Sequence, residues 1–181
     1  MPRLHRLLVQ SRGSAVNKTD PVFTAEQREK KGLETFSHPL NPERSEMRGV
    51  SLSEAVGLQR IAVHLAVLPA GKESFVYHTH LREEEWLFVL VGRGRIEIDG
   101  EMRDLGPGDF CGFVTPSAAH QLSNPYTEDI VYLTGGERTS MEVSEFPRLR
   151  KLMVRTGMQA KLYPLEPEPF RPYVGDDPDK T

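Results

Sequence analysis

The sequence of 181 residues predicts an all-β protein: a jelly-roll barrel of about eight short antiparallel strands, with a short N-terminal helix and irregular termini. Three observations lead to this fold class. Short apolar segments recur at roughly 8–12-residue intervals between turn signals, which is typical of sandwiches and barrels. Several of these segments alternate apolar and polar residues, as strands with one buried face do. The turns between them are dense in Gly, Pro, Asn and Asp.

Composition places the chain among ordinary globular proteins. Hydrophobic residues make up 38% and charged residues 27% of the chain, and the formal net charge is −3. Bulk electrostatics therefore gives no reason to expect a nucleic-acid partner. No apolar run approaches the roughly 18 residues of a membrane span, so no membrane partner is expected. No internal repeat is visible, so we expect one barrel unit.

The single cysteine, Cys111, excludes an intramolecular disulfide. This favours a reducing compartment, and we expect a cytoplasmic protein. Cys111 lies in a short apolar segment, where a small buried hydrophobe is a better interpretation than a nucleophile or a metal ligand.

The first 19 residues carry four basic side chains and no acidic one before Asp20. Two interpretations are open for this segment. It weakly resembles a mitochondrial transit segment, but a basic arm that packs on the barrel or on a second subunit is favoured. Residues 7–10 resemble a strand. Residues 1–57 as a whole are expected to form an arm and a short helix on the barrel.

Within that arm, Thr24 to Gln27 has the pattern of a capping box, and Gly32 can end the helix that begins there. Residues 33–50 contain proline and show no clear period, so no element is assigned to them. His64 lies on the first strong strand, where alternation alone leaves open whether it faces the cavity or the outside. A packed structural histidine is the preferred interpretation.

The barrel strands come next in order, separated by clear turns. Asp99-Gly100 is a strong signal for a two-residue hairpin, and Gly106 to Asp109 is a second turn. Gly92 ends a strand at a turn that is expected to need positive φ. The expected strands are residues 58–68, 85–91, 95–98, 102–105, 110–114, 119–122 and 130–134.

A group of metal-binding residue types stands out in this order. His78 and His80 point the same way if they lie on a strand, because side chains alternate along it. Leu81 to Glu84 is short and charged enough for a hairpin turn, and Glu85 opens the next strand. An antiparallel partner then brings two imidazoles and one carboxylate together, with His120 as a fourth candidate. The alternative is a surface hairpin with incidental histidines, which the paired spacing disfavours.

These residues resemble the first motif of the cupin family, G-x5-H-x-H-x3/4-E-x6-G. The chain has Gly71, six residues, His78, Thr79, His80, four residues, Glu85, six residues and Gly92. One extra residue after the first glycine is the departure. The family's glutamate ligand corresponds to the residue with six positions before the last glycine. The two preceding acids are then solvated turn residues, Glu83 and Glu84.

The second cupin motif, G-x5-P-x-G-x2-H-x3-N, is matched less closely by Gly108 to Asn124. His120, three residues and the asparagine fit. Pro116 lies one residue too close to the histidine, and Ser117-Ala118 replaces the expected glycine. With flanking strands, the resemblance covers roughly residues 58–136, and residues 137–181 are a C-terminal extension. The subgroup it resembles is that of uncharacterised bacterial single-domain cupins.

The resemblance implies one divalent ion (iron, manganese, nickel or zinc) held by four residues and a small-molecule ligand in the barrel. The expected ligands are His78, His80, Glu85 and His120. We expect a metal-dependent enzyme, an oxygenase, isomerase or lyase, acting on a small organic acid, phenolic or sugar-derived substrate. The alternative is a non-catalytic, regulatory binding module, because a fold does not determine a function. A polar cavity lining would favour the enzyme and an apolar lining the binding module.

The remaining predictions concern the C-terminal segment and assembly. Residues 147–155 are basic and are expected to form a short helix or an outer strand, whereas Tyr163 to Thr181 is expected to be an extended or disordered tail. Large apolar side chains, Trp86, Phe88 and Leu90, face outward on the Glu85 strand. Monomers avoid such patches, so a homodimer is expected. The alternative is that the N-terminal segment covers them.

Overall fold

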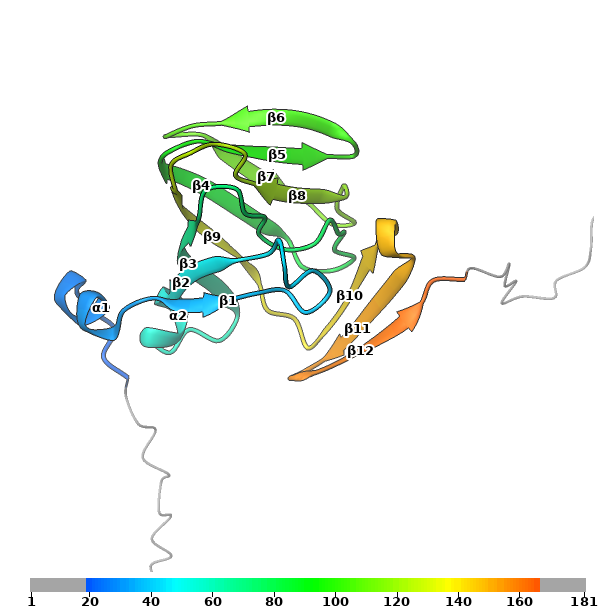
Figure 1. The fold of residues 1–181 in the computed structure, drawn as a ribbon. Coiled ribbons are helices and arrows are strands. Elements are labelled where there is room, and N and C mark those ends of the chain that lie inside the picture. The colour runs from blue at the N-terminus through cyan, green and yellow to red at the C-terminus, as the bar shows by residue number, and fades with distance from the viewer. Residues whose placement is uncertain (1–18, 167–181) are drawn as a thin grey trace, which may run out of the picture.

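Strands in three sheets make up most of the protein (Figure 1). The computed structural model describes residues 19–166, so the N-terminal transit-like or arm segment and residues 7–10 lie outside the described residues. The six-stranded sheet has the order β1-β2-β3-β9-β4-β7, and two three-stranded sheets have the orders β6-β5-β8 and β10-β11-β12. The strands are β1 (Glu34–Phe36), β2 (Met47–Ser51), β3 (Ile61–Leu68), β4 (Glu85–Val91), β5 (Gly94–Ile98), β6 (Glu101–Leu105), β7 (Phe110–Phe113), β8 (His120–Ser123), β9 (Ile130–Glu137), β10 (Met141–Phe146), β11 (Lys151–Thr156) and β12 (Gln159–Pro164).

The predicted jelly-roll fold is confirmed. The six-stranded sheet and the β6-β5-β8 sheet face each other across one apolar core, and all strand pairs within the sheets are antiparallel. Leu68, Val89 and Ile130 from the larger sheet and Ile96 and Leu122 from the smaller one are almost fully buried in this core. Burial of this apolar surface drives the two sheets together.

The predicted N-terminal helix is confirmed as α1 (Ala25–Lys31). The hydroxyl of Thr24 accepts the backbone N–H of Gln27, and the Gln27 side chain accepts the Thr24 N–H, which completes a capping box. Gly32, at a φ of 73°, ends the helix. The region without a clear period contributes β1 and β2 to the edge of the six-stranded sheet, and the single-turn helix α2 (Leu52–Ala55) comes after them.

The predicted turns are also confirmed. Asp99 and Gly100 both have positive φ, 48° and 86°, in the two-residue turn that joins β5 to β6. Gly108, at a φ of 91°, lies in the turn before β7. Gly92 has a φ of 80°, and a Cβ atom there would overlap the carbonyl oxygen of Asp129. Glycine is therefore favoured at this position for two reasons: the positive φ and the close approach of the neighbouring chain segment at Asp129.

The predicted hairpin between the histidine segment and the Glu85 strand is wrong. β4 is hydrogen-bonded on both edges, to β9 and to β7, so no edge is left for the histidine segment. His78 instead forms an isolated antiparallel bridge with His120, and their backbones exchange two hydrogen bonds of 3.1 and 2.8 Å. The histidines therefore reach this point from the side of the β6-β5-β8 sheet, and the glutamate reaches it from the six-stranded sheet.

The C-terminal segment forms a sheet of its own that closes one end of the barrel (Figure 1). Both interpretations of residues 147–155 are partly right, because the turn of 3₁₀ helix η1 (Pro147–Leu149) precedes β11. Tyr163 and Pro164, predicted as tail, are the last residues of β12, although all six residues of that strand are exposed. The rest of the predicted tail from residue 167 lies outside the described residues. Within residues 19–166, no helix is both long and apolar enough to cross a membrane.

Candidate metal centre

The structure brings the four predicted residues together. The segment before β4 carries His78 and His80, Glu85 is the first residue of β4, and His120 is the first residue of β8. One nitrogen or oxygen atom from each of the four lies within 4.8 Å of the corresponding atoms of the other three. Glu85 lies opposite Gly136 of β9. A Cβ atom at position 136 would lie 2.5 Å from the Glu84 carbonyl oxygen, so glycine allows the two strands to approach closely here.

The ring nitrogens of two histidines are oriented by the backbone. His78 Nδ1 lies 2.7 Å from the carbonyl oxygen of Val76, and His120 Nδ1 lies 2.9 Å from that of Ala118. A carbonyl oxygen only accepts, so each Nδ1 carries the proton and donates it. In the neutral ring the Nε2 atom then presents a lone pair toward the cluster, as a metal ligand must.

The spacing of the inward atoms suits a transition-metal ion. The Nε2 atoms of His78 and His80 are 3.0 Å apart, and Glu85 Oε2 lies 3.2 Å from His80 Nε2, 3.1 Å from His120 Nε2 and 3.8 Å from His78 Nε2. Ligand bonds of roughly 2.1 Å at right angles put neighbouring ligand atoms about 3.0 Å apart. The residues present therefore fit a divalent ion with nitrogen and oxygen ligands.

Burial and mutual contacts shift the pKa values of three of these four side chains. Burial lowers the pKa of His78 to about 3, so the ring is neutral near pH 7. Burial alone would raise the pKa of Glu85, but hydrogen bonds from His120 and His80 outweigh it and the pKa is lowered. Burial alone would lower the pKa of His80, but its hydrogen bond to Glu85 and the nearby carboxylates raise it. Without an ion, the Glu85 carboxylate and the His80 imidazole thus each stabilise the charged form of the other.

The loop that departs from the second motif has a role in the site. The backbone N–H of His80 donates to Ser117 Oγ at 2.7 Å, and the Ser117 N–H donates to the His80 carbonyl at 2.8 Å. Serine in place of the expected glycine therefore binds the His80 segment to the His120 side of the barrel. The His120 ring also stacks on Phe113, with centroids 3.6 Å apart and planes 9° apart.

Two cavities adjoin the cluster. The smaller, about 30 Å³, lies in the barrel interior and is lined by His78, Glu85 and His120 among others. The larger, about 380 Å³, is open and lies between the six-stranded sheet and the C-terminal sheet. It falls within the range of small-molecule sites. Its lining mixes apolar with polar side chains, including His38, His64, Glu83, Thr134, Glu137, Ser144, Phe146 and Met153.

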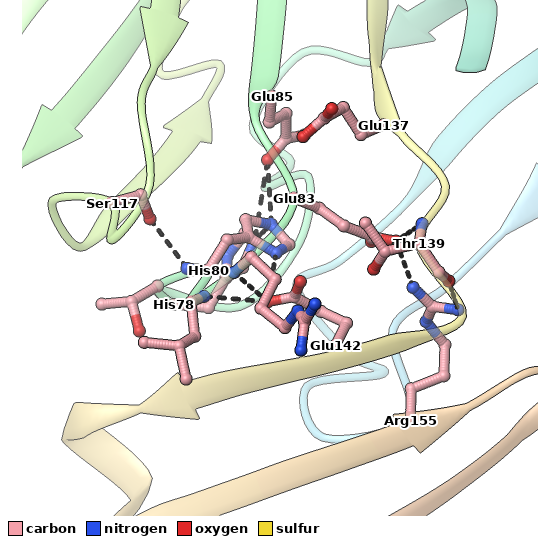
Figure 2. Close-up of polar contacts among 12 residues, drawn as sticks. His78, His80, Glu83, Glu85, Ser117, Glu137, Thr139, Glu142 and Arg155 are labelled. Atoms are coloured by element: carbon pink, nitrogen blue, oxygen red, sulfur yellow. Dashed lines mark hydrogen bonds and ion pairs between the residues drawn. The ribbon is translucent and has the colours of Figure 1, made fainter. Parts of the chain in front are cut away.

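Several of these residues were not predicted as site residues. His64, whose direction was left open, lines the larger cavity, and burial lowers its pKa. Glu83 was predicted to be solvated, and this is wrong: its side chain is only 14% exposed and pairs with Arg155 and Thr139 (Figure 2). Glu84 is exposed, as predicted. The cavity residues of β10, Ser144 and Phe146, had no sequence signal, because Ser144 and the buried Glu142 break the apolar alternation expected of buried strand positions.

The fold and the cluster define a class of protein, a β-barrel with a three-histidine, one-glutamate centre. The sequence model of the family described as Cupin domain (Cupin_2) matches residues 64–135. A solved structure from Acidithiobacillus ferrooxidans, provisionally named a sugar phosphate isomerase, is 36% identical, with a TM-score of 0.78, over 83% of this chain and 96% of that one. The chain belongs to the cupin superfamily.

Two further relatives extend the comparison. A sugar phosphate isomerase of the cupin superfamily from Silicibacter pomeroyi is 21% identical, with a TM-score of 0.67, over 77% of this chain and 90% of that one, and this likeness concerns the fold alone. An uncharacterized protein of Methanocaldococcus jannaschii, MJ1618, is 30% identical over 59 residues, or 33% of this chain. The match spans 46% of that relative, about half its length.

Proposed function

We propose that the protein binds one divalent transition-metal ion at His78, His80, Glu85 and His120 and is an enzyme acting on a small organic substrate. The ion is iron, manganese, nickel or zinc. The observation that carries the proposal is a cavity of about 380 Å³ directly beside the four residues, whose mostly apolar lining includes polar side chains such as His64 and Thr134. Three neutral imidazoles and one carboxylate leave a net charge of +1 on the site, and such an ion supplies polarisation of a substrate carbonyl.

The chain's own residues favour chemistry over binding alone. His64 lines the cavity, and because burial lowers its pKa the ring is neutral near pH 7 and can accept a proton. Thr134, paired with His64 across β3 and β9, adds a hydroxyl. Phe75, Phe146 and Met153 form an apolar part of the lining that excludes water from one side of a bound compound.

Among oxygenase, isomerase and lyase chemistry, an isomerase acting on a sugar-derived compound has the best support, from the relative that is 36% identical. Interconverting an aldose and a ketose moves a proton between adjacent carbons, which requires a base beside a polarised carbonyl. His64 is the candidate base. The organic acids and phenolic compounds remain the other substrate classes of the proposal.

The test combines metal analysis with activity measurements. Purified protein loaded with iron, manganese, nickel or zinc is assayed for interconversion of aldoses and ketoses, phosphorylated and unphosphorylated, and for oxygen uptake. His64→Ala is expected to retain the metal and lose turnover. Ile61→Ala, an exposed change on the outer side of the same strand, is the control and should retain both.

The alternative, a non-catalytic binding module, makes a different prediction. Saturable binding of one of these compounds, with no turnover by any metal form, would favour it. If no metal form binds the ion in a 1:1 ratio, the proposal fails at its first step.

For assembly, we propose a homodimer formed through the outer face of the six-stranded sheet. Trp86, Phe88 and Leu90 of β4 point to this face, and Phe110 of β7 lies opposite Phe88 and is 64% exposed. Trp86 and Phe110 stack with ring centroids 6.2 Å apart. Exposed apolar patches of this kind mark interaction sites, and a two-fold dimer would bury the same patch of both subunits against each other.

A further inference from the structure

Three buried polar atoms in the described part of the chain have no hydrogen-bond partner: His80 Nδ1, Glu142 Oε2 and Ser144 Oγ. His80 belongs to the candidate metal centre, whereas the other two residues point inward from β10. Buried polar groups are nearly always paired, so an unpaired group needs an explanation. Glu142 needs one most, because its carboxylate is 1% exposed and its Oε2 atom has no donor.

Glu142 lies directly behind the His80 ring. One of its oxygens, Oε1, accepts the backbone N–H groups of Leu81 at 2.8 Å and Arg82 at 3.3 Å, and lies 3.6 Å from His80 Nδ1. In Figure 2 the carboxylates of Glu85 and Glu142 lie on opposite sides of the His80 ring. Glu85 contacts Nε2 and Glu142 faces Nδ1, so the imidazole lies between two carboxylates.

The other two histidines indicate what this neighbour does. His78 and His120 each donate Nδ1–H to the carbonyl oxygen two residues earlier in the chain. His80 makes no such bond, and its Nδ1 faces a carboxylate instead. A side chain from another sheet thus occupies the place that a carbonyl oxygen takes at the other two histidines, where a partner keeps the proton on Nδ1 and leaves Nε2 free to bind.

The backbone keeps Glu142 in this place. The N–H of Thr79 donates to the Glu145 carbonyl at 2.9 Å, and the N–H of Leu81 donates to the Val143 carbonyl at 2.9 Å. The segment that carries His80 is thus hydrogen-bonded along β10 on both sides of the residue. Glu142 lies on the inward face of β10 next to the Val143 bond, and its Oε1 also accepts the N–H groups of Leu81 and Arg82, so its carboxylate has little freedom to move away from the ring.

A second ion is the competing explanation, because ligand atoms of His80, Glu83 and Glu142 also lie within 4.8 Å of one another. However, Arg155 of β11 already pairs with Glu83 and supplies a positive charge there (Figure 2). Glu142 Oε1, which already accepts two backbone N–H groups, is the oxygen that faces His80 Nδ1, at 3.6 Å. The nearest side chain that can present a proton to this carboxylate is therefore the His80 ring, and the positive charge of Arg155 makes a second cation beside Glu83 less favourable.

We propose that Glu142 is a positioning residue for His80: it fixes the tautomer and orientation of the ring and thereby raises the metal affinity of the centre. The inference rests on the proposed metal site and deepens it. It assigns a role at the site to the C-terminal sheet, which lies outside the matched family segment of residues 64–135. Removing such a carboxylate partner typically weakens metal binding 10- to 100-fold.

The test measures zinc affinity by competition with a chelator in the full-length protein. Glu142→Gln, which keeps the shape of the side chain and removes its charge, is expected to weaken zinc binding 10- to 100-fold. Glu145→Gln is the matched control: it makes the same change on the exposed side of the same strand, and its affinity should equal that of the wild type. Equal affinities for all three proteins would overturn the inference and leave the metal site intact, whereas no zinc binding by the wild type would overturn the metal site itself.

Two readouts do not depend on the variant folding. Nitrogen-15 NMR of the zinc-loaded wild type should show His80 with a proton on Nδ1 and the metal on Nε2, and the opposite arrangement would overturn the inference. Elemental analysis should give one zinc per chain. Two per chain would mean that the carboxylate binds a second ion, which also overturns it.

Discussion

Replacing Gly92 with alanine should destabilise the protein by more than the cost of the backbone angle alone. Gly92 has a φ of 80°, which costs an L-residue about 1 kcal/mol. A Cβ atom there would also overlap the Asp129 carbonyl oxygen and lie 3.1 Å from the Cα atom of Ile130. Both are backbone atoms, and overpacking against atoms that cannot rotate away adds about 1–3 kcal/mol. The total is about 2–4 kcal/mol.

Gly100 provides the matched control. It has nearly the same φ, 86°, but no atom lies within 4 Å of its Cβ position. Gly100→Ala therefore carries the cost of the angle without the overlap, and the lower freedom of alanine in the unfolded chain is common to both variants. For a chain of this size, each kcal/mol lowers Tm by roughly 2–4 °C. We expect a loss of about 2–4 °C for Gly100→Ala and about 5–15 °C for Gly92→Ala.

The assay is thermal unfolding monitored by circular dichroism, with a chelator present so that bound metal does not contribute. Equal losses of Tm in the two variants would refute the reasoning, since they would show that β4 and the chain at Asp129 separate at no cost. An unchanged Tm for both would also refute the cost assigned to positive φ.

Three further predictions concern the site and the assembly. His78→Ala or His120→Ala should remove most bound metal and, with it, the rise in Tm that metal gives the wild type; full occupancy by elemental analysis in both variants would contradict the four-residue centre. Metal affinity should fall as the pH is lowered, because the ion must displace a proton from the His80 ring, whose pKa lies above its usual 6.5. Below that pKa the affinity should fall by up to one log unit per pH unit. Titration calorimetry that gives a constant affinity between pH 6 and 8 would argue against this. Phe110→Asp should convert a dimer to a monomer by placing a charge in the apolar face, and light scattering that gives the 20.4 kDa chain mass for the wild type would refute the dimer itself.

Much of the local structure could be predicted from the sequence. The capping box at Thr24, the hairpin at Asp99-Gly100 and the positive φ of Gly92 depend on a few adjacent residues and their φ/ψ preferences. The strand pattern likewise arises from alternation within short segments. The four residues of the candidate centre were chosen from their spacing and from the family resemblance, and the structure brings all four together.

The partners of these segments were decided by the tertiary structure. Spacing placed His78 and His80 opposite Glu85 in a hairpin, but β9 and β7 occupy both edges of β4, so the histidines pair with the strand of His120 instead. Alternation along one strand left the direction of His64 open, because the choice of face depends on which side the other sheet covers.

The C-terminal sheet shows the same limit most clearly. Glu142 is a polar residue at an ordinary position in the sequence, and nothing near it in the chain indicates that it is buried. It is buried because β10 is hydrogen-bonded to the segment on either side of His80, about sixty residues earlier. The residue types and their spacing determined which side chains can bind a metal, whereas barrel closure determined which carboxylate stands behind each of them, because that depends on contacts between distant segments.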